Sequence, residues 1–119
     1  LPHGTFEAPC IVTLRLLQFF SRSTATVADQ IRPLRKYFHS GEINSTVQNK
    51  AAIMEKIKST YGPTATATSE LDGITIEYPD YWFNVRASNT EALLRLNLEA
   101  TSAALRDTKT TELLNLIRA

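Results

Sequence analysis

Residues 86–91 form the segment best suited to chemistry, and they read Arg-Ala-Ser-Asn-Thr-Glu. Arg86 offers a guanidinium fork whose donors match the oxygens of a phosphate or a carboxylate. Ser88 and Thr90 offer hydroxyl donors, and Asn89 offers an amide N–H. A tight turn adds backbone N–H groups that converge on the same point. The pattern predicts a segment that binds and positions a phosphate.

The segment holds no group that could cleave a bond, because none of its hydroxyls stands beside a base that would activate it. A second interpretation stays open at this point. In polar turns, side chains such as Ser88 and Asn89 also serve only to satisfy neighbouring backbone groups. Under either interpretation, we expect no catalytic residue in this segment.

Other reactive residue types are scarce. His3 and His39 have no carboxylate or second histidine at metal-ligand spacing, so His39 is expected to be an exposed linker residue. Cys10 is the one cysteine, which excludes an intramolecular disulfide and a cysteine-based zinc cluster. It is expected to be a small buried hydrophobe. The sequence predicts no metal ligand in this chain.

Two predicted strands flank the polar segment and must position it. Residues 81–85 are aromatic and β-branched, and residues 94–100 alternate Leu or Ala with polar residues. Asp72-Gly73 predicts a hairpin turn before a strand at 74–78, because both positions tolerate positive φ. The remaining predicted elements are a strand at 43–47, a helix that Asn49 caps and Gly62-Pro63 ends, and a closing helix with Leu113, Leu114 and Ile117 on one stripe.

These elements define an α+β class. Short turns connect antiparallel neighbours, so we expect an antiparallel sheet of about four strands with two helices on one face. Residues 9–20 predict a further helix whose apolar stripe is broad enough to need more protein than this chain supplies. Thr26 predicts the start of a short second helix. The first 40 residues carry five basic and two acidic groups, and the remainder carries eight and ten, which places a domain boundary near Ser40 and Gly41.

Composition bounds the function classes. With 119 residues, 43% hydrophobic and 21% charged, the chain is expected to form a packed core. A net charge of +1 disfavours nucleic acid as a partner, and no apolar run reaches the roughly 18 to 20 residues of a membrane helix. The single cysteine suits a cytoplasmic protein.

Residues 81–100, which read YWFNVRASNTEALLRLNLEA, resemble the C-terminal domain of the α-D-phosphohexomutases, in their phosphomannomutase and phosphoglucomutase branch. Residues 41–47 resemble the first strand of that domain, and residues 72–74 resemble its hairpin. Asn89 favours this branch, because phosphoglucosamine mutases usually carry Gly there. Ala92 stands where the family usually has proline, so the loop is expected to be less rigid.

The resemblance implies that residues 41–119 are the last domain of a four-domain enzyme, with a fold like that of the TATA-box-binding protein, and that residues 1–40 are the helical end and linker of the preceding domain. It further implies that Arg86, Ser88, Asn89 and Thr90 hold the phosphate that is not being transferred while a hexose 6-phosphate and a hexose 1-phosphate interconvert.

The expected partners are mannose or glucose 1- or 6-phosphate and the preceding domains. No cofactor is expected in this chain, and magnesium is expected in the full-length enzyme. The chain by itself is expected to be inactive. The alternative is a free-standing α+β binding module without an enzymatic role.

Overall fold

The computed structural model describes residues 8–119. Its contacts divide the chain between Arg35 and Lys36, and the two units are described separately. His3 lies outside the described residues, as do the first seven residues of the predicted segment 1–40. The domain boundary near residue 40 stays a prediction.

The N-terminal unit consists of short helices without a core among its described residues. It contains α1 (Pro9–Ser21), α2 (Val27–Ile31) and the 3-10 turn η1 (Arg32–Leu34). Pro9 begins α1, and the Thr26 hydroxyl caps α2 by accepting the Asp29 N–H at 3.2 Å. Neither helix buries a residue. Cys10 is exposed, so the expectation that it is buried was wrong.

The C-terminal unit is built on one antiparallel sheet, which confirms the predicted α+β class. Its strands are β1 (Phe38–His39), β2 (Ile43–Thr46), β3 (Ala67–Ser69), β4 (Ile74–Glu77), β5 (Tyr81–Ala87) and β6 (Leu93–Ala100). They lie in the order β1-β6-β5-β4-β3, and β2 also pairs with β6. The sheet has six strands where about four were expected, because the two-residue β1 and the three-residue β3 are short additions at its edges.

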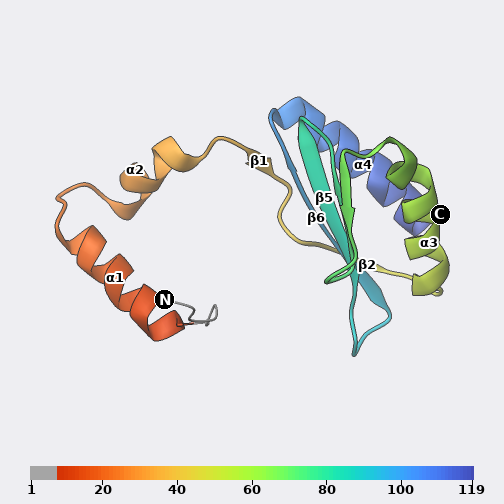
Figure 1. The fold of residues 1–119 in the computed structure, drawn as a ribbon, viewed down its shortest axis with the longest axis horizontal. Coiled ribbons are helices and arrows are strands. Elements are labelled where there is room, and N and C mark those ends of the chain that lie inside the picture. The colour runs from red at the N-terminus through yellow and green to blue at the C-terminus, as the bar shows by residue number, and fades with distance from the viewer. Residues whose placement is uncertain (1–7) are drawn as a thin grey trace, which may run out of the picture. The chain divides into compact units, whose positions relative to one another are not determined.

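Two helices cover one face of this sheet, as predicted. They are α3 (Lys50–Tyr61), which continues into the 3-10 turn η2 (Gly62–Thr64), and α4 (Ala103–Arg118). Figure 1 shows both on the same side of the sheet. The Asn49 side chain caps α3 by accepting the Ala52 N–H at 3.0 Å. Ser102 caps α4 in the same way.

The core lies between the sheet and these helices. Strand alternation sends every second side chain into it, and its largest fully buried members are Phe83, Ile57, Ile76, Leu94, Leu96, Leu98, Leu113, Ile117 and Val85. Burial raises the pKa of the Tyr81 hydroxyl above its ordinary value, with Tyr78 nearby adding to the effect. The other side chains of the same strands lie on the opposite face of the sheet, which neither α3 nor α4 covers.

The turn between β3 and β4 differs from the predicted two-residue hairpin. Gly73 has a φ of +75°, whereas Asp72 does not have a positive φ. The strands stop pairing at Ser69 and Thr75, which makes the connection longer. A Cβ on Gly73 would lie 2.4 Å from the carbonyl oxygen of Val85 and 2.7 Å from the Cα of Arg86. The turn therefore packs directly on the backbone of β5.

The strands β1 and β2 are separated by a short break in the pairing, and this break positions Glu42, the residue just before β2. Ser40 donates its N–H to the Leu98 carbonyl at 2.8 Å, and its hydroxyl accepts the Leu98 N–H at 3.0 Å. Gly41 then adopts a φ of +74°, which glycine tolerates without strain. The chain rejoins the edge of β6 at Ile43, directly after Glu42.

Candidate anion-binding site

The four residues predicted from the sequence line one hollow of about 240 Å³. Its other lining residues are Asp72, Ala87 and Arg95. Strand β5 extends to Ala87, so Arg86 lies on a strand and not in the loop where the sequence analysis placed it. A side chain on a paired strand is better fixed than one on a loop, which suits the residue with the strongest donor set.

Ser88 and Glu91 shape the loop that follows β5. Ser88 is buried, donates its N–H to the Leu93 carbonyl at 3.0 Å, and accepts the Glu91 N–H on its hydroxyl oxygen at 3.2 Å. These contacts are those of a polar turn. The hydroxyl proton of Ser88 is still available as a donor, because accepting one hydrogen bond does not use it. The turn interpretation and the binding interpretation are therefore compatible.

Lys50 holds the loop from the first turn of α3. Its Nζ donates to the carbonyl oxygens of Ser88 at 2.7 Å and Glu91 at 2.9 Å. In a trans peptide, C=O and N–H point in opposite directions, so the N–H of Asn89 points away from Lys50. Within residues 8–119, the backbone N–H groups of Asn89 and Thr90 have no hydrogen-bond acceptor. Both are therefore without a partner in this part of the chain, and their role in binding an anion stays a prediction.

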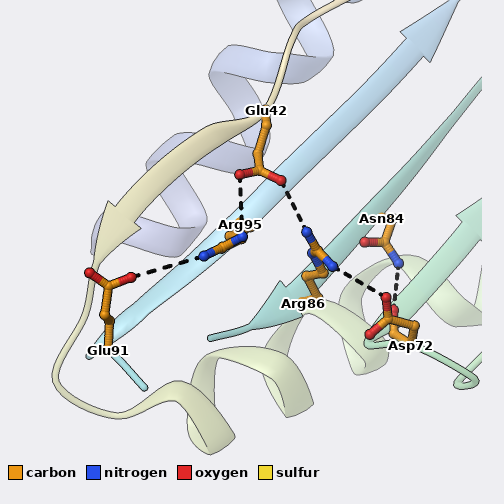
Figure 2. Close-up of polar contacts among 6 residues, drawn as sticks. All are labelled: Glu42, Asp72, Asn84, Arg86, Glu91 and Arg95. Atoms are coloured by element: carbon orange, nitrogen blue, oxygen red, sulfur yellow. Dashed lines mark hydrogen bonds and ion pairs between the residues drawn. The ribbon is translucent and has the colours of Figure 1, made fainter. Parts of the chain in front are cut away.

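Arg86 and Arg95 stand directly opposite each other in the pairing of β5 with β6. Like charges at such a position destabilise a sheet unless a counter-charge lies between them. Glu42 supplies it: one carboxylate oxygen lies 3.2 Å from Nη2 of Arg86, and the other lies 3.6 Å from Nη1 of Arg95 (Figure 2). The hollow is thus bordered by two guanidinium groups that share one carboxylate.

Two further carboxylates approach the arginine pair from its outer sides. Asp72 Oδ2 lies 3.5 Å from Nη1 of Arg86, and Glu91 Oε2 lies 3.9 Å from Nη2 of Arg95. Arg95 Nε is buried and has no partner in the described part of the chain. All of these ion pairs are partly exposed, and pairs of this kind contribute roughly 0 to 1 kcal/mol each. They leave the guanidinium groups able to exchange partners.

The sequence analysis missed Lys50, Glu42 and Arg95. For Arg95 the signal in the sequence was weak. The alternation of its strand places Arg95 among the outward-facing residues, but only the register of β5 with β6 places it opposite Arg86. His39 is exposed, as expected, and its Nδ1 accepts the Gly41 N–H at 2.8 Å.

No metal ligand set accompanies these residues. Within residues 8–119, no group of three or more His, Cys, Asp or Glu side chains is placed to hold a metal ion. The magnesium expected for the full-length enzyme therefore does not fit the described residues, and no chemical step here involves it. None of the helices described between residues 8 and 119 has the length and apolar character of a membrane span.

Comparisons with known proteins give a consistent result. Residues 42–112 match the family model described as phosphoglucomutase/phosphomannomutase, C-terminal domain. The chain is 41% identical over 114 residues to a phosphomannomutase of Methanocaldococcus jannaschii, covering 96% of this chain and 25% of that protein. It is 45% identical over 80 residues to a phosphomannomutase of Escherichia coli, covering 66% of this chain and 18% of that protein.

The fold has a counterpart among solved structures. A crystal structure of a phosphoglucomutase/phosphomannomutase family protein from Burkholderia thailandensis superposes with a TM-score of 0.67 at 23% sequence identity, over 96% of this chain and 24% of that one. The chain thus spans about a quarter of the length of the full-length relatives that it matches.

Proposed function

The chain belongs to the phosphoglucomutase/phosphomannomutase family as its C-terminal domain, and on this basis we propose that its hollow binds the non-transferred phosphate of a hexose phosphate. The family predicted from residues 81–100 is thereby confirmed. The proposed reaction of the whole enzyme is the interconversion of hexose 6-phosphate and hexose 1-phosphate, with mannose or glucose as the sugar. The names of the relatives support this choice.

One observation carries the proposal. Arg86, Ser88, Asn89 and Thr90 line a single hollow, and a second arginine, Arg95, also lines it. Two arginines, the hydroxyls of Ser88 and Thr90 and the free backbone N–H groups of Asn89 and Thr90 form a donor set for an oxyanion. The described neighbours provide no nucleophile with an adjacent base. The chemistry of this domain is therefore binding and orientation.

Phosphoryl transfer depends on positioning and on neutralising the charge of the transferred group. The domain supplies the first of these, and the preceding domains are proposed to supply the phosphoryl acceptor and the magnesium ion. For the same reason, we propose that the 119-residue chain has no mutase activity by itself. The exposed apolar side chains of α1, among them Leu14 and Phe19, are proposed to contact those preceding domains.

A nuclear magnetic resonance titration tests the proposal. Inorganic phosphate or a hexose phosphate added to the 119-residue chain should shift the amide signals of residues 88–91 first. Binding should be weak, on the order of millimolar, because one anchoring group must overcome an association cost of roughly 4 to 15 kcal/mol.

The matched control is sodium chloride at the same ionic strength, which should leave residues 88–91 unchanged. If phosphate shifts a different surface and the loop stays silent, the proposal that this hollow binds the phosphate is wrong.

A further inference from the structure

Asp72 stands at the border of the proposed phosphate hollow, although its charge has the wrong sign for an anion site. It is one of the residues that line the hollow, and its carboxylate faces Arg86 (Figure 2). Glu42 and Glu91 also contact the arginine pair, but neither lines the hollow. Asp72 is thus the carboxylate that an incoming phosphate meets.

The backbone fixes Asp72 in this place. Asn84, on β5, donates its side-chain amide to the Asp72 carbonyl at 2.9 Å. The neighbouring Gly73 lies against the backbone of Val85 and Arg86, so closely that any side chain on it would clash. Three contacts therefore connect this turn to β5, and the nearness of Asp72 to Arg86 follows from the fold.

Charge balance decides what must happen when a phosphate binds. Arg86 and Arg95 carry two positive charges, and the three carboxylates that contact them carry three negative charges. A phosphate dianion adds two negative charges to a cluster that already carries a net charge of −1, so it repels these carboxylates and competes with them for the guanidinium groups.

Of the two carboxylates that contact Arg86, Asp72 gives way more easily than Glu42. Its side chain is 78% exposed, against 37% for Glu42, so water replaces its lost contact at small cost. Its distance to Arg86 is 3.5 Å, longer than the 3.2 Å between Glu42 and the same guanidinium. Glu42 also contacts both arginines, which keeps it in place.

We propose that Asp72 is a displaceable internal anion that pairs with Arg86 when the hollow is empty and releases it when phosphate binds. This inference rests on the proposed function. Asp72 acts as a positioning residue: it keeps the guanidinium of Arg86 facing the hollow, and it competes with the ligand. The competition weakens phosphate binding and favours release.

The test is the affinity of the 119-residue chain for inorganic phosphate, measured from the amide shifts of residues 88–91 at low ionic strength. Asp72→Asn should bind phosphate about 1.5- to fivefold more tightly than the wild-type chain, and the gain should shrink as salt is added. A damaged hairpin would weaken binding, so the direction of the change separates competition from a structural effect. Asp72→Ser removes the same charge and should show the same gain.

Glu70→Gln is the matched control. Glu70 lies two residues earlier in the same turn, pairs with Lys58 and does not line the hollow. The substitution Glu70→Gln removes the same charge as Asp72→Asn, and the affinity for phosphate should not change. Equal gains in the Asp72 and Glu70 variants would reduce the effect to net charge and overturn the inference.

The inference also fails, with the proposed function intact, if wild-type residues 88–91 respond to phosphate but neither Asp72 variant binds more tightly. If the wild-type loop does not respond at all, the proposed function itself is wrong, and the inference is wrong with it.

Discussion

Arg86 differs from the other donors around the hollow because it combines a permanent charge with a rigid fork. A hydrogen bond to a charged group is worth roughly 1.5 to 3 kcal/mol, against about 1 kcal/mol for a neutral hydroxyl. In the full-length enzyme, Arg86→Ala should therefore lower kcat/KM by roughly ten- to 150-fold. Thr90→Ala should lower it by a smaller factor.

Arg86→Lys separates the charge from the fork. It should recover only part of the loss, because an ammonium group is a point charge that cannot bind two oxygens in parallel. Steady-state kinetics of the three variants check this order. A value of kcat/KM for Arg86→Ala within twofold of wild type would contradict the assignment of Arg86.

At the residue scale, the predictable part of the site was the part that is contiguous in the chain. Residues 86–90 carry their donors in one short segment, so composition alone predicted a segment that binds an anion. Glu42 lies 44 residues from Arg86, and Lys50 lies 41 residues from Glu91. Only strand register and helix docking bring these side chains to the loop, and neither can be read from the spacing of the residues.

At the element scale, the turn between β3 and β4 is the connection with the tightest steric requirement. Gly73→Ala combines the strain of a positive φ, about 1 to 2 kcal/mol, with a Cβ placed 2.4 Å from a backbone oxygen that no side-chain rotation can relieve. It should lower the free energy of unfolding by more than the φ strain alone.

Gly41→Ala provides the matched control for that measurement. Gly41 has nearly the same positive φ, at +74°, but a Cβ there would meet nothing within 4 Å. Urea denaturation should place Gly41→Ala between the wild-type chain and Gly73→Ala. Equal stability of the two variants would show that the close approach of Gly73 to β5 costs nothing.

The length and periodicity of an element explain whether the sequence could predict it. The helix α3 and the strand β6 carry strong periodic patterns and were confirmed within a few residues. The closing helix was predicted only from its stripe at residues 113–117, and α4 begins ten residues earlier, at Ala103. The pattern did not reveal β1, because a strand of two residues has no period to detect. It also ended β5 too early, at Val85, because Arg86 and Ala87 read as loop residues until β6 pairs with them.

At the scale of the whole molecule, the two units should differ in protection from hydrogen exchange. Helices α1 and α2 bury no residue, whereas β5 and β6 supply fully buried side chains such as Phe83 and Leu98. In the 119-residue chain, amides of residues 9–31 should exchange at close to the rate of an unstructured peptide, and those of β5 and β6 should exchange slowest.

Hydrogen exchange followed by mass spectrometry or nuclear magnetic resonance checks this expectation, with the well-packed helix α4 as the internal reference. Protection of α1 equal to that of β6 would show that the N-terminal unit is stabilised within this chain.

The position of β6 also determines how fast this domain can fold. It pairs with β5 on one side and with both β1 and β2 on the other, so the sheet is not complete until β6 is in place. Its bond to Ser40 joins residues 58 apart, and the contact between Arg118 and Ser45 joins residues 73 apart. Closing such long loops costs entropy before the contacts repay it, so the rate-limiting step of folding should be the capture of β1 and β2 by β6.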